Sequence, residues 1–132
     1  MNIDWKRLID QAKNVRKKAY APYSRFPVGA AVLCSSGKIY TGCNVENSSF
    51  GLTICAERNA IAAAVANGEK EVIAVAIVAD RDILAAPCGA CRQVIYEFGK
   101  KAKILLMNLK GKKKTFSIID LLPEPFSFKK SR

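Results

Sequence analysis

The chain has 132 residues, of which 50% are hydrophobic and 25% are charged, a composition typical of a soluble globular protein. Its length predicts one domain, residues 1–132, that is large enough to bury a core. The longest apolar run, residues 72–79, is too short to span a bilayer, and the N-terminus has no hydrophobic stretch of the signal-peptide type. These features argue against a membrane-spanning or secreted protein.

The net charge is +11, and so basic a chain can be interpreted as a partner of RNA or DNA. The basic residues, however, are scattered over one helix face, several turns and the C-terminal end, and no aromatic residues interleave with them to stack bases. Charge alone indicates solubility and nonspecific binding. We therefore expect solvated lysine surfaces and no nucleic-acid partner.

The first half of the chain predicts a helix, a strand hairpin and a second helix. Asp4 can cap the first helix, whose apolar residues fall on one stripe. Pro22 and Pro27 bracket the loop that follows it. In the second helix we expect Ile61, Ala62 and Val65 to face inward. The predicted bounds are about 4–19 for the first helix, 28–35 and 39–46 for the strands, and 55–67 for the second helix.

The second half predicts three strands and two helices. Residues 72–79 are apolar at every position, which indicates a central strand buried on both faces. The other predicted elements are a helix over about 88–98, strands over 104–109 and 115–117, and a short helix over 118–122. Residues 129–132 are expected to fray.

This order of elements predicts an α/β fold of three layers, α-β-α, around a mixed five-stranded sheet. The helical crossovers would make the central strands parallel, and the two hairpins would make the outer pairs antiparallel.

Three of the five cysteines have the spacing of a metal site. Cys55 is followed by Glu57, and Cys88 and Cys91 are three positions apart after a proline. The chain has no histidine, so a soft metal must be bound by thiolates. Three ligands leave one position open, which is typical of a catalytic zinc ion. Free thiols also indicate a reducing, cytoplasmic setting rather than a disulfide framework.

The predicted elements bring these residues together. Cys55 and Cys88 both fall at helix starts, where free N–H groups and the helix dipole stabilise thiolates. In a layered α/β fold two such helix starts can be neighbours at one end of the sheet. Glu57 is then placed to transfer protons, and Arg58 is the cation expected against a sulfur, because three thiolates leave a zinc centre with one negative charge.

Other interpretations of these residues remain open. The cysteines could form a structural site with Cys34 or Cys43, or Cys88 and Cys91 could be a redox dithiol, but neither alternative explains Glu57. Several further residues have ordinary structural interpretations when taken alone. Phe26 and Phe126 can be core aromatics, and Asn44 and Glu46 can be a polar pair on an exposed strand end.

The chain nevertheless resembles the small, homotetrameric, zinc-dependent cytidine deaminases along nearly its whole length. The matching segments are YSRFPVGAA (23–31), GCNVEN (42–47), CAER (55–58), PCGACRQ (87–93) and LLPEPF (121–126). The resemblance implies the cytidine-deaminase-like fold and hydrolytic deamination of cytidine and 2′-deoxycytidine to uridine and 2′-deoxyuridine, as in pyrimidine salvage. It also implies one Zn²⁺ per chain and a homotetramer with shared active sites.

The resemblance implies a role for each matched residue. Cys55, Cys88 and Cys91 would bind zinc, Glu57 would be catalytic, and Arg58 and Gln93 would lie against the zinc ligands. Asn44 and Glu46 would bind the ribose, Phe26 and the Ala56 backbone would contact the base, and Phe50 and Phe126 would reach a neighbouring subunit's site. Phe50 stands where relatives often have tyrosine, and the motif does not account for the basic charge.

Two other activities remain as alternatives. One is deamination of another aminopyrimidine nucleoside, such as a nucleoside antibiotic, although the Asn44-Val45-Glu46 motif favours an ordinary nucleoside. The other is editing of a nucleic acid. The direct turn at Gly111-Lys112 argues against editing, because polynucleotide deaminases of this superfamily generally join their last strands through a helix.

Overall fold

The computed structural model describes residues 2–128 and contains a five-stranded sheet with the strand order β2-β1-β3-β4-β5. The elements in chain order are α1 (Trp5–Arg16), β1 (Val28–Cys34), β2 (Ile39–Cys43), the 3₁₀ turn η1 (Phe50–Leu52), α2 (Ala56–Ala66), β3 (Val72–Ala79), α3 (Gly89–Phe98), β4 (Lys103–Met107), β5 (Lys113–Ser117) and α4 (Ile118–Leu121). No helix within residues 2–128 is long and apolar enough to cross a membrane.

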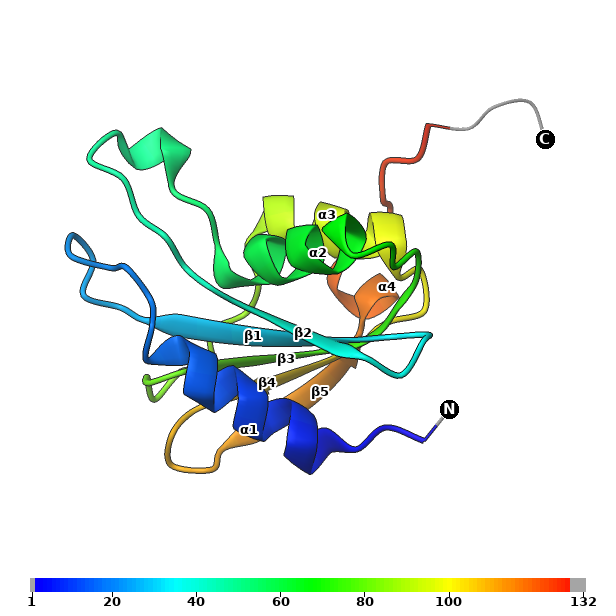
Figure 1. Ribbon diagram of the computed structural model, residues 1–132, viewed down its shortest axis with the longest axis horizontal. Coiled ribbons are helices and arrows are strands. Elements are labelled where there is room, and N and C mark those ends of the chain that lie inside the picture. Colours follow the sequence, from blue (N-terminus) through cyan, green and yellow to red (C-terminus); the bar gives the residue numbers. More distant parts are fainter. Residues whose placement is uncertain (1, 129–132) are drawn as a thin grey trace.

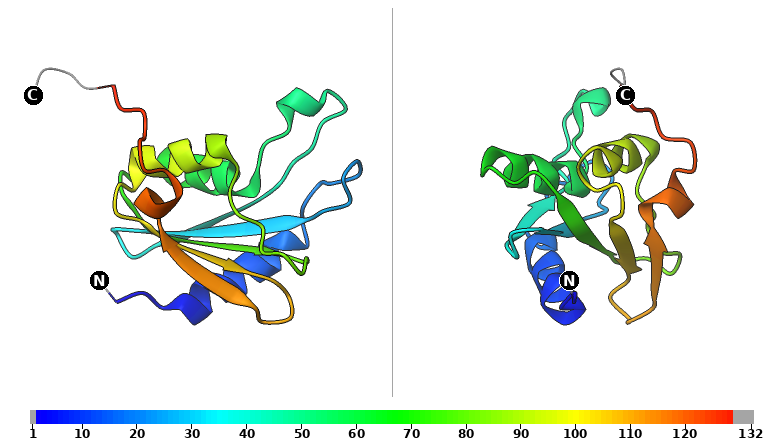
Figure 2. Two further views of the ribbon diagram at one scale, coloured as in Figure 1. Left: turned by 180° about the vertical axis from the view of Figure 1, so that it is seen from behind. Right: turned by 90° about the vertical axis from the view of Figure 1, so that its right-hand side faces the viewer.

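The three expected layers are present (Figures 1 and 2). Helix α1 covers one face of the sheet and buries Leu8 and Ala12 against it. Helices α2 and α3 lie on the opposite face, where Ile61 and Ile95 are buried in the larger of two hydrophobic clusters. The sheet therefore has an apolar core on each side, and β3 is its buried central strand as expected.

The sheet is mixed, as expected, but one pair of central strands runs in a direction that was not expected. Strands β3 and β4 are parallel and joined by α3, and the hairpins β1–β2 and β4–β5 are antiparallel, as expected. The expectation that all central strands are parallel is wrong for β1, which pairs antiparallel with β3. Strand β1 is buried at nearly every residue and β2 is not, so β1 takes the inner position and β2 becomes the edge.

Helix α2 packs very closely on the hairpin, and this sets the place of the residues at its start. A Cβ atom on Gly42 would lie 2.3 Å from the Ala60 backbone nitrogen, so only glycine permits the approach. The buried face of α2 is accordingly made of small residues that include Ala60 and Ala64. Our expectation that Ala62 and Val65 face inward is wrong, because both are exposed.

Three elements end two or three residues earlier than the sequence predicted, and one of them is β4, which ends at Met107 rather than at residue 109. Helix α1 ends at Arg16 rather than near residue 19. Strand β2 ends at Cys43, and the Asn44 side chain then binds the backbone at and just before the start of β1: Asn44 Oδ1 accepts from Val28 N (2.9 Å) and Asn44 Nδ2 donates to Phe26 O (3.0 Å). The expectation for residues 129–132 falls outside the described residues.

Candidate active site

The three cysteines that were predicted to bind metal lie together. Cys55 immediately precedes α2 and Cys88 immediately precedes α3, and Cys91 lies in the first turn of α3. The Sγ atoms are 3.9 Å apart for Cys55–Cys88 and 3.4 Å apart for Cys88–Cys91, and all three lie within 4.8 Å of one another. Tetrahedral zinc with bonds of about 2.3 Å to sulfur places its ligand atoms roughly 3.8 Å apart. The donor set and its spacing therefore fit Zn²⁺.

Hydrogen bonds around the sulfurs favour thiolate formation. Cys91 N donates to Cys88 Sγ (3.4 Å), as expected for a helix start, and Arg58 Nη2 donates to Cys55 Sγ (3.6 Å). Hydrogen bonds from Cys91 and Arg58 hold the pKa of the Cys55 thiol below its usual value. The pKa of the Cys91 thiol is raised, by its hydrogen bond with Cys55 and by burial. Thiols bind zinc as thiolates, so metal binding at this cluster would release protons.

Glu57 is the buried carboxylate beside this cluster. Its side chain lies in the first turn of α2, and the residue is only 5% exposed. Burial raises the pKa of Glu57 to about 7, and the neighbouring Cys55 charge acts in the same direction, whereas hydrogen bonding to backbone and the Arg58 charge oppose it. A carboxyl group with this pKa can both accept and donate a proton near neutral pH.

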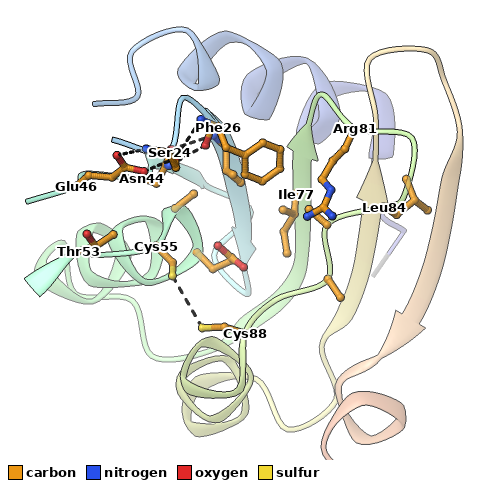
Figure 3. Close-up of a pocket in the computed structure, with 15 residues that line it drawn as sticks. Ser24, Phe26, Asn44, Glu46, Thr53, Cys55, Ile77, Arg81, Leu84 and Cys88 are labelled. Atoms are coloured by element: carbon orange, nitrogen blue, oxygen red, sulfur yellow. Dashed lines mark hydrogen bonds between the residues drawn. The ribbon is translucent and has the colours of Figure 1, made fainter. Parts of the chain in front are cut away.

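Glu57 is one of the residues that line a pocket of about 290 Å³, which Figure 3 shows. This volume is just below the roughly 300–1,000 Å³ of typical small-molecule sites. The walls combine an apolar side with a polar end. The predicted residues that line the pocket are Phe26, Asn44, Glu46, Cys55, Ala56, Glu57 and Cys88. The pocket is thus large enough for one small ligand and is bordered by two of the three cysteines.

The polar end of the pocket contains Asn44 and Glu46, which are both buried. Glu46 Oε1 accepts from the backbone N–H groups of Tyr23 (3.0 Å) and Ser24 (3.1 Å), and the Ser24 hydroxyl donates to Glu46 Oε2. The Ser24 hydroxyl also accepts from Phe26 N (3.0 Å). The two residues therefore fix the loop that carries Phe26, and the Ser24 hydrogen bond holds the pKa of Glu46 below its usual range.

Five predicted site residues lie outside this pocket: Cys91 and Arg58, which belong to the sulfur cluster, and Phe50, Gln93 and Phe126. Phe50 is 72% exposed and Phe126 is 71% exposed, and the Phe50 ring lies 5.6 Å from that of Tyr23. Gln93 was expected against the zinc ligands. In this structure its side chain bonds to the Phe126 backbone, as donor to the carbonyl (2.8 Å) and acceptor from the N–H (3.2 Å).

Several pocket residues were not singled out from the sequence. Ser24 lay within a matched segment but showed no signal of its own. Residues 80–86 form the loop between β3 and Pro87, and four of them line the pocket: Arg81, Leu84, Ala85 and Ala86. Their position before the Pro-Cys motif was the one available signal, because a loop leading into a ligand cysteine must pass near the site.

Comparison with known proteins agrees with this geometry. Residues 3–107 match the family model for the cytidine and deoxycytidylate deaminase zinc-binding region. The chain is 48% identical to a cytidine deaminase of Sporosarcina psychrophila over 95% of this chain and 93% of that protein. It is 40% identical to a cytidine deaminase of Mycobacterium tuberculosis over 95% of this chain and 91% of that protein.

Solved structures give the same result for the fold. The crystal structure of cytidine deaminase from Burkholderia pseudomallei superposes with a TM-score of 0.90 at 47% identity, covering 94% of this chain and all (100%) of that one. Cytidine deaminase from Bacillus anthracis, at 20% identity and a TM-score of 0.68 over 89% of this chain and 86% of that one, shares the fold. The chain therefore belongs to the zinc-dependent cytidine and deoxycytidylate deaminase family.

Proposed function

We propose that this chain is a zinc-dependent cytidine deaminase that hydrolyses cytidine and 2′-deoxycytidine to uridine and 2′-deoxyuridine with release of ammonia. The observation that carries the proposal is the position of Glu57. This carboxylate is buried beside three sulfurs in the floor of a nucleoside-sized pocket. The names of the relatives support cytidine as the substrate.

The reaction needs a nucleophile at carbon and protons at nitrogen. Cys55, Cys88 and Cys91 would hold the zinc ion, which when bound supplies the Lewis acidity that makes water nucleophilic near neutral pH. Glu57 would take a proton from the attacking water and give it to the ring nitrogen. It would then take the proton of the hydroxyl group added to carbon and give it to the amino group, which leaves as ammonia. The burial of Glu57 excludes bulk water from these transfers and keeps its pKa near the working pH.

The remaining pocket residues orient the nucleoside. Asn44 and Glu46 form the polar end and receive the ribose hydroxyls, and the hydrogen bonds that already hold them reduce the cost of ordering on binding. Phe26 packs against the pyrimidine, and the Ala56 backbone contacts the base. The apolar pocket wall and the polar end thus match the two halves of a nucleoside.

The proposal extends to assembly and location. A homotetramer with shared active sites is supported by the exposure of Phe50 and Phe126, since large aromatic side chains are enriched at protein–protein interfaces. A role in pyrimidine salvage is the ordinary use of free nucleoside deamination. The free thiols of the cluster favour the reducing cytoplasm.

No observation favours either alternative activity. Strands β4 and β5 form a direct antiparallel hairpin, which is the connection that argued against a polynucleotide substrate, and the relatives are named for cytidine.

The test is an absorbance assay of purified protein with cytidine, 2′-deoxycytidine and a cytosine-containing oligonucleotide. Turnover of both nucleosides without turnover of the oligonucleotide is expected. Turnover of the oligonucleotide alone, or of neither nucleoside at metal-replete conditions, would overturn the proposal.

A further inference from the structure

A cationic side chain from the loop 80–86 lines the pocket without being part of any motif. Arg81 follows the end of β3 by two residues, and Figure 3 shows its side chain extending from the loop toward Ile77. The centre of its guanidinium lies 5.3 Å from the centroid of the Phe26 ring. Among the residues that line this pocket, Arg81 is the one with a permanent positive charge.

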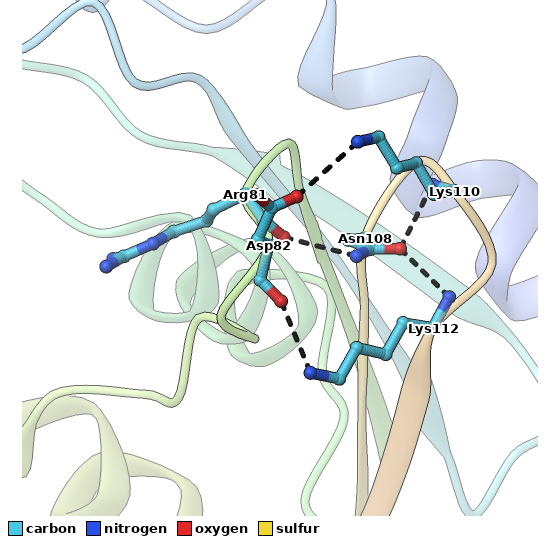
Figure 4. A network of polar contacts seen from close by, with 5 residues as sticks. All are labelled: Arg81, Asp82, Asn108, Lys110 and Lys112. Carbon is cyan, nitrogen blue, oxygen red and sulfur yellow. Dashed lines mark hydrogen bonds and ion pairs between the residues drawn. The ribbon is translucent and has the colours of Figure 1, made fainter.

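The backbone of Arg81 is anchored to the turn between β4 and β5 (Figure 4). Asn108 is buried, and its Nδ2 donates to the Arg81 carbonyl (3.2 Å) while its Oδ1 accepts from Lys110 N (3.0 Å) and Lys112 N (2.9 Å). The adjacent Asp82 is held from the same turn, by an ion pair with Lys110 (3.5 Å) and a bond from Lys112 Nζ to its carbonyl (3.4 Å). The start of the loop is therefore fixed.

The Arg81 guanidinium interacts with the Phe26 ring rather than with a carboxylate. Within the described residues the two ion pairs join Lys6 with Asp10 and Lys110 with Asp82, and neither involves Arg81. A guanidinium within about 6 Å of a ring centroid is attracted by the electron-rich face of the ring. Phe26 is otherwise held through its backbone, by Ser24 and Asn44, and those bonds leave the ring free to rotate.

We propose that Arg81 is a positioning residue of the nucleoside pocket, which holds the Phe26 ring in the orientation that receives the pyrimidine. The inference rests on the proposed function. The loop 80–86, which contains none of the site motifs, would then contribute a contact to the pocket. Asn108, in the turn between β4 and β5, would support the Phe26 ring indirectly by holding the Arg81 backbone.

The test compares Arg81→Met, which keeps a long side chain without charge, with Arg81→Lys, which keeps the cation. For cytidine we expect Arg81→Met to raise KM about two- to fivefold, the range set by an exposed cation–π contact, with kcat within twofold of the parent. Arg81→Lys should recover most of the change. Lys100→Met is the control for lost charge, because Lys100 lies over Tyr96 (5.9 Å) rather than over a pocket residue.

A double-mutant cycle shows whether the effect passes through the ring. Phe26→Leu removes the ring, so the double variant Phe26→Leu/Arg81→Met should have the same KM as Phe26→Leu alone. An unchanged KM in Arg81→Met alone, or an equal rise in both backgrounds, would overturn the inference. Arg81 is exposed on a loop, so the variants should keep the parent's melting temperature and zinc content. A parent protein without deaminase activity would instead contradict the proposed function.

Discussion

The side-chain amide of Gln93 forms two hydrogen bonds with the backbone of Phe126: Gln93 Nε2 donates to the Phe126 carbonyl, and Gln93 Oε1 accepts from the Phe126 N–H. Gln93 lies in α3 two residues beyond Cys91, so the helix that begins after Cys88 and contains Cys91 also contacts the segment that carries Phe126. The ring of Phe126 remains 71% exposed. A backbone held by two hydrogen bonds, with an exposed aromatic side chain, is suited to the proposed contact with a neighbouring subunit.

Phe126→Ala should therefore raise KM without removing zinc, because the proposed partner pocket loses its contact while the cluster in the same chain stays intact. Gln93→Ala should raise KM in the same direction by a smaller factor, since the ring is kept but loses its anchor. Steady-state kinetics, zinc analysis and light scattering measure the three properties. A fully active monomer, or a Phe126→Ala enzyme with the parent KM, would contradict the shared-site proposal.

Removal of one cluster thiol should abolish metal binding and activity together. In Cys88→Ala the remaining two sulfurs cannot complete a three-ligand site. Metal analysis of the parent should give one zinc per chain, and the variant should give much less. Cys43→Ala is the matched control, because its thiol lies outside the cluster. Full activity in metal-stripped parent protein would refute a zinc mechanism.

Ser24 is expected to act on substrate affinity through Glu46. Its hydroxyl donates to the Glu46 carboxylate and accepts from Phe26 N, and hydrogen bonds to charged groups contribute about 1.5–3 kcal/mol. Ser24→Ala should therefore raise KM for cytidine by about tenfold or more, with a smaller change in kcat. The control is Ser36→Ala, which removes a hydroxyl bonded to Glu69 (2.7 Å) away from the pocket. Equal KM values for the two variants would show that Ser24 has no such role.

The sequence predicted the fold and the metal cluster well because both depend on local patterns. Apolar periodicity located the helices and strands, and the spacing of Cys88 and Cys91 within one helix turn fixed their proximity. The antiparallel pairing of β1 with β3 was not predicted, because edge and inner positions depend on burial across the whole sheet. Arg81 was missed for a similar reason: its place in the pocket depends on a long-range bond to Asn108.

Glu57→Gln should keep zinc and fold while losing most of the activity. The substitution preserves size and hydrogen-bonding capacity but removes the group that accepts the proton, and general acid–base catalysis contributes typically ~10²–10⁴-fold. Because Glu57 would serve several transfers, the loss in kcat should reach or exceed the upper part of this range. The measurement is kcat at matched zinc occupancy. Near-native turnover would show that another group transfers the protons.

The charge of the metal centre leads to a prediction for Arg58. Three thiolates around Zn²⁺ leave one net negative charge, which weakens the metal as a Lewis acid. Arg58 Nη2 lies 3.6 Å from Cys55 Sγ, and its Nε is buried without a hydrogen-bond partner in the described part of the chain. We expect this guanidinium to withdraw charge from the Cys55 thiolate, as a group that contacts a metal ligand can. On this view Arg58 would restore part of the Lewis acidity of a bound zinc ion.

Arg58→Gln should consequently keep all three ligands but lower kcat and lose zinc faster when a chelator is added. Arg58→Lys should fall between the parent and Arg58→Gln, because an ammonium supplies the charge without the planar donor geometry of a guanidinium. The competing interpretation is that Arg58 serves only as a surface residue of α2. It predicts that both variants match the parent in kcat and in the rate of zinc loss. Its contact with Cys55 and its partly buried position argue against that result, and zinc release measured with a chromogenic chelator decides between the two.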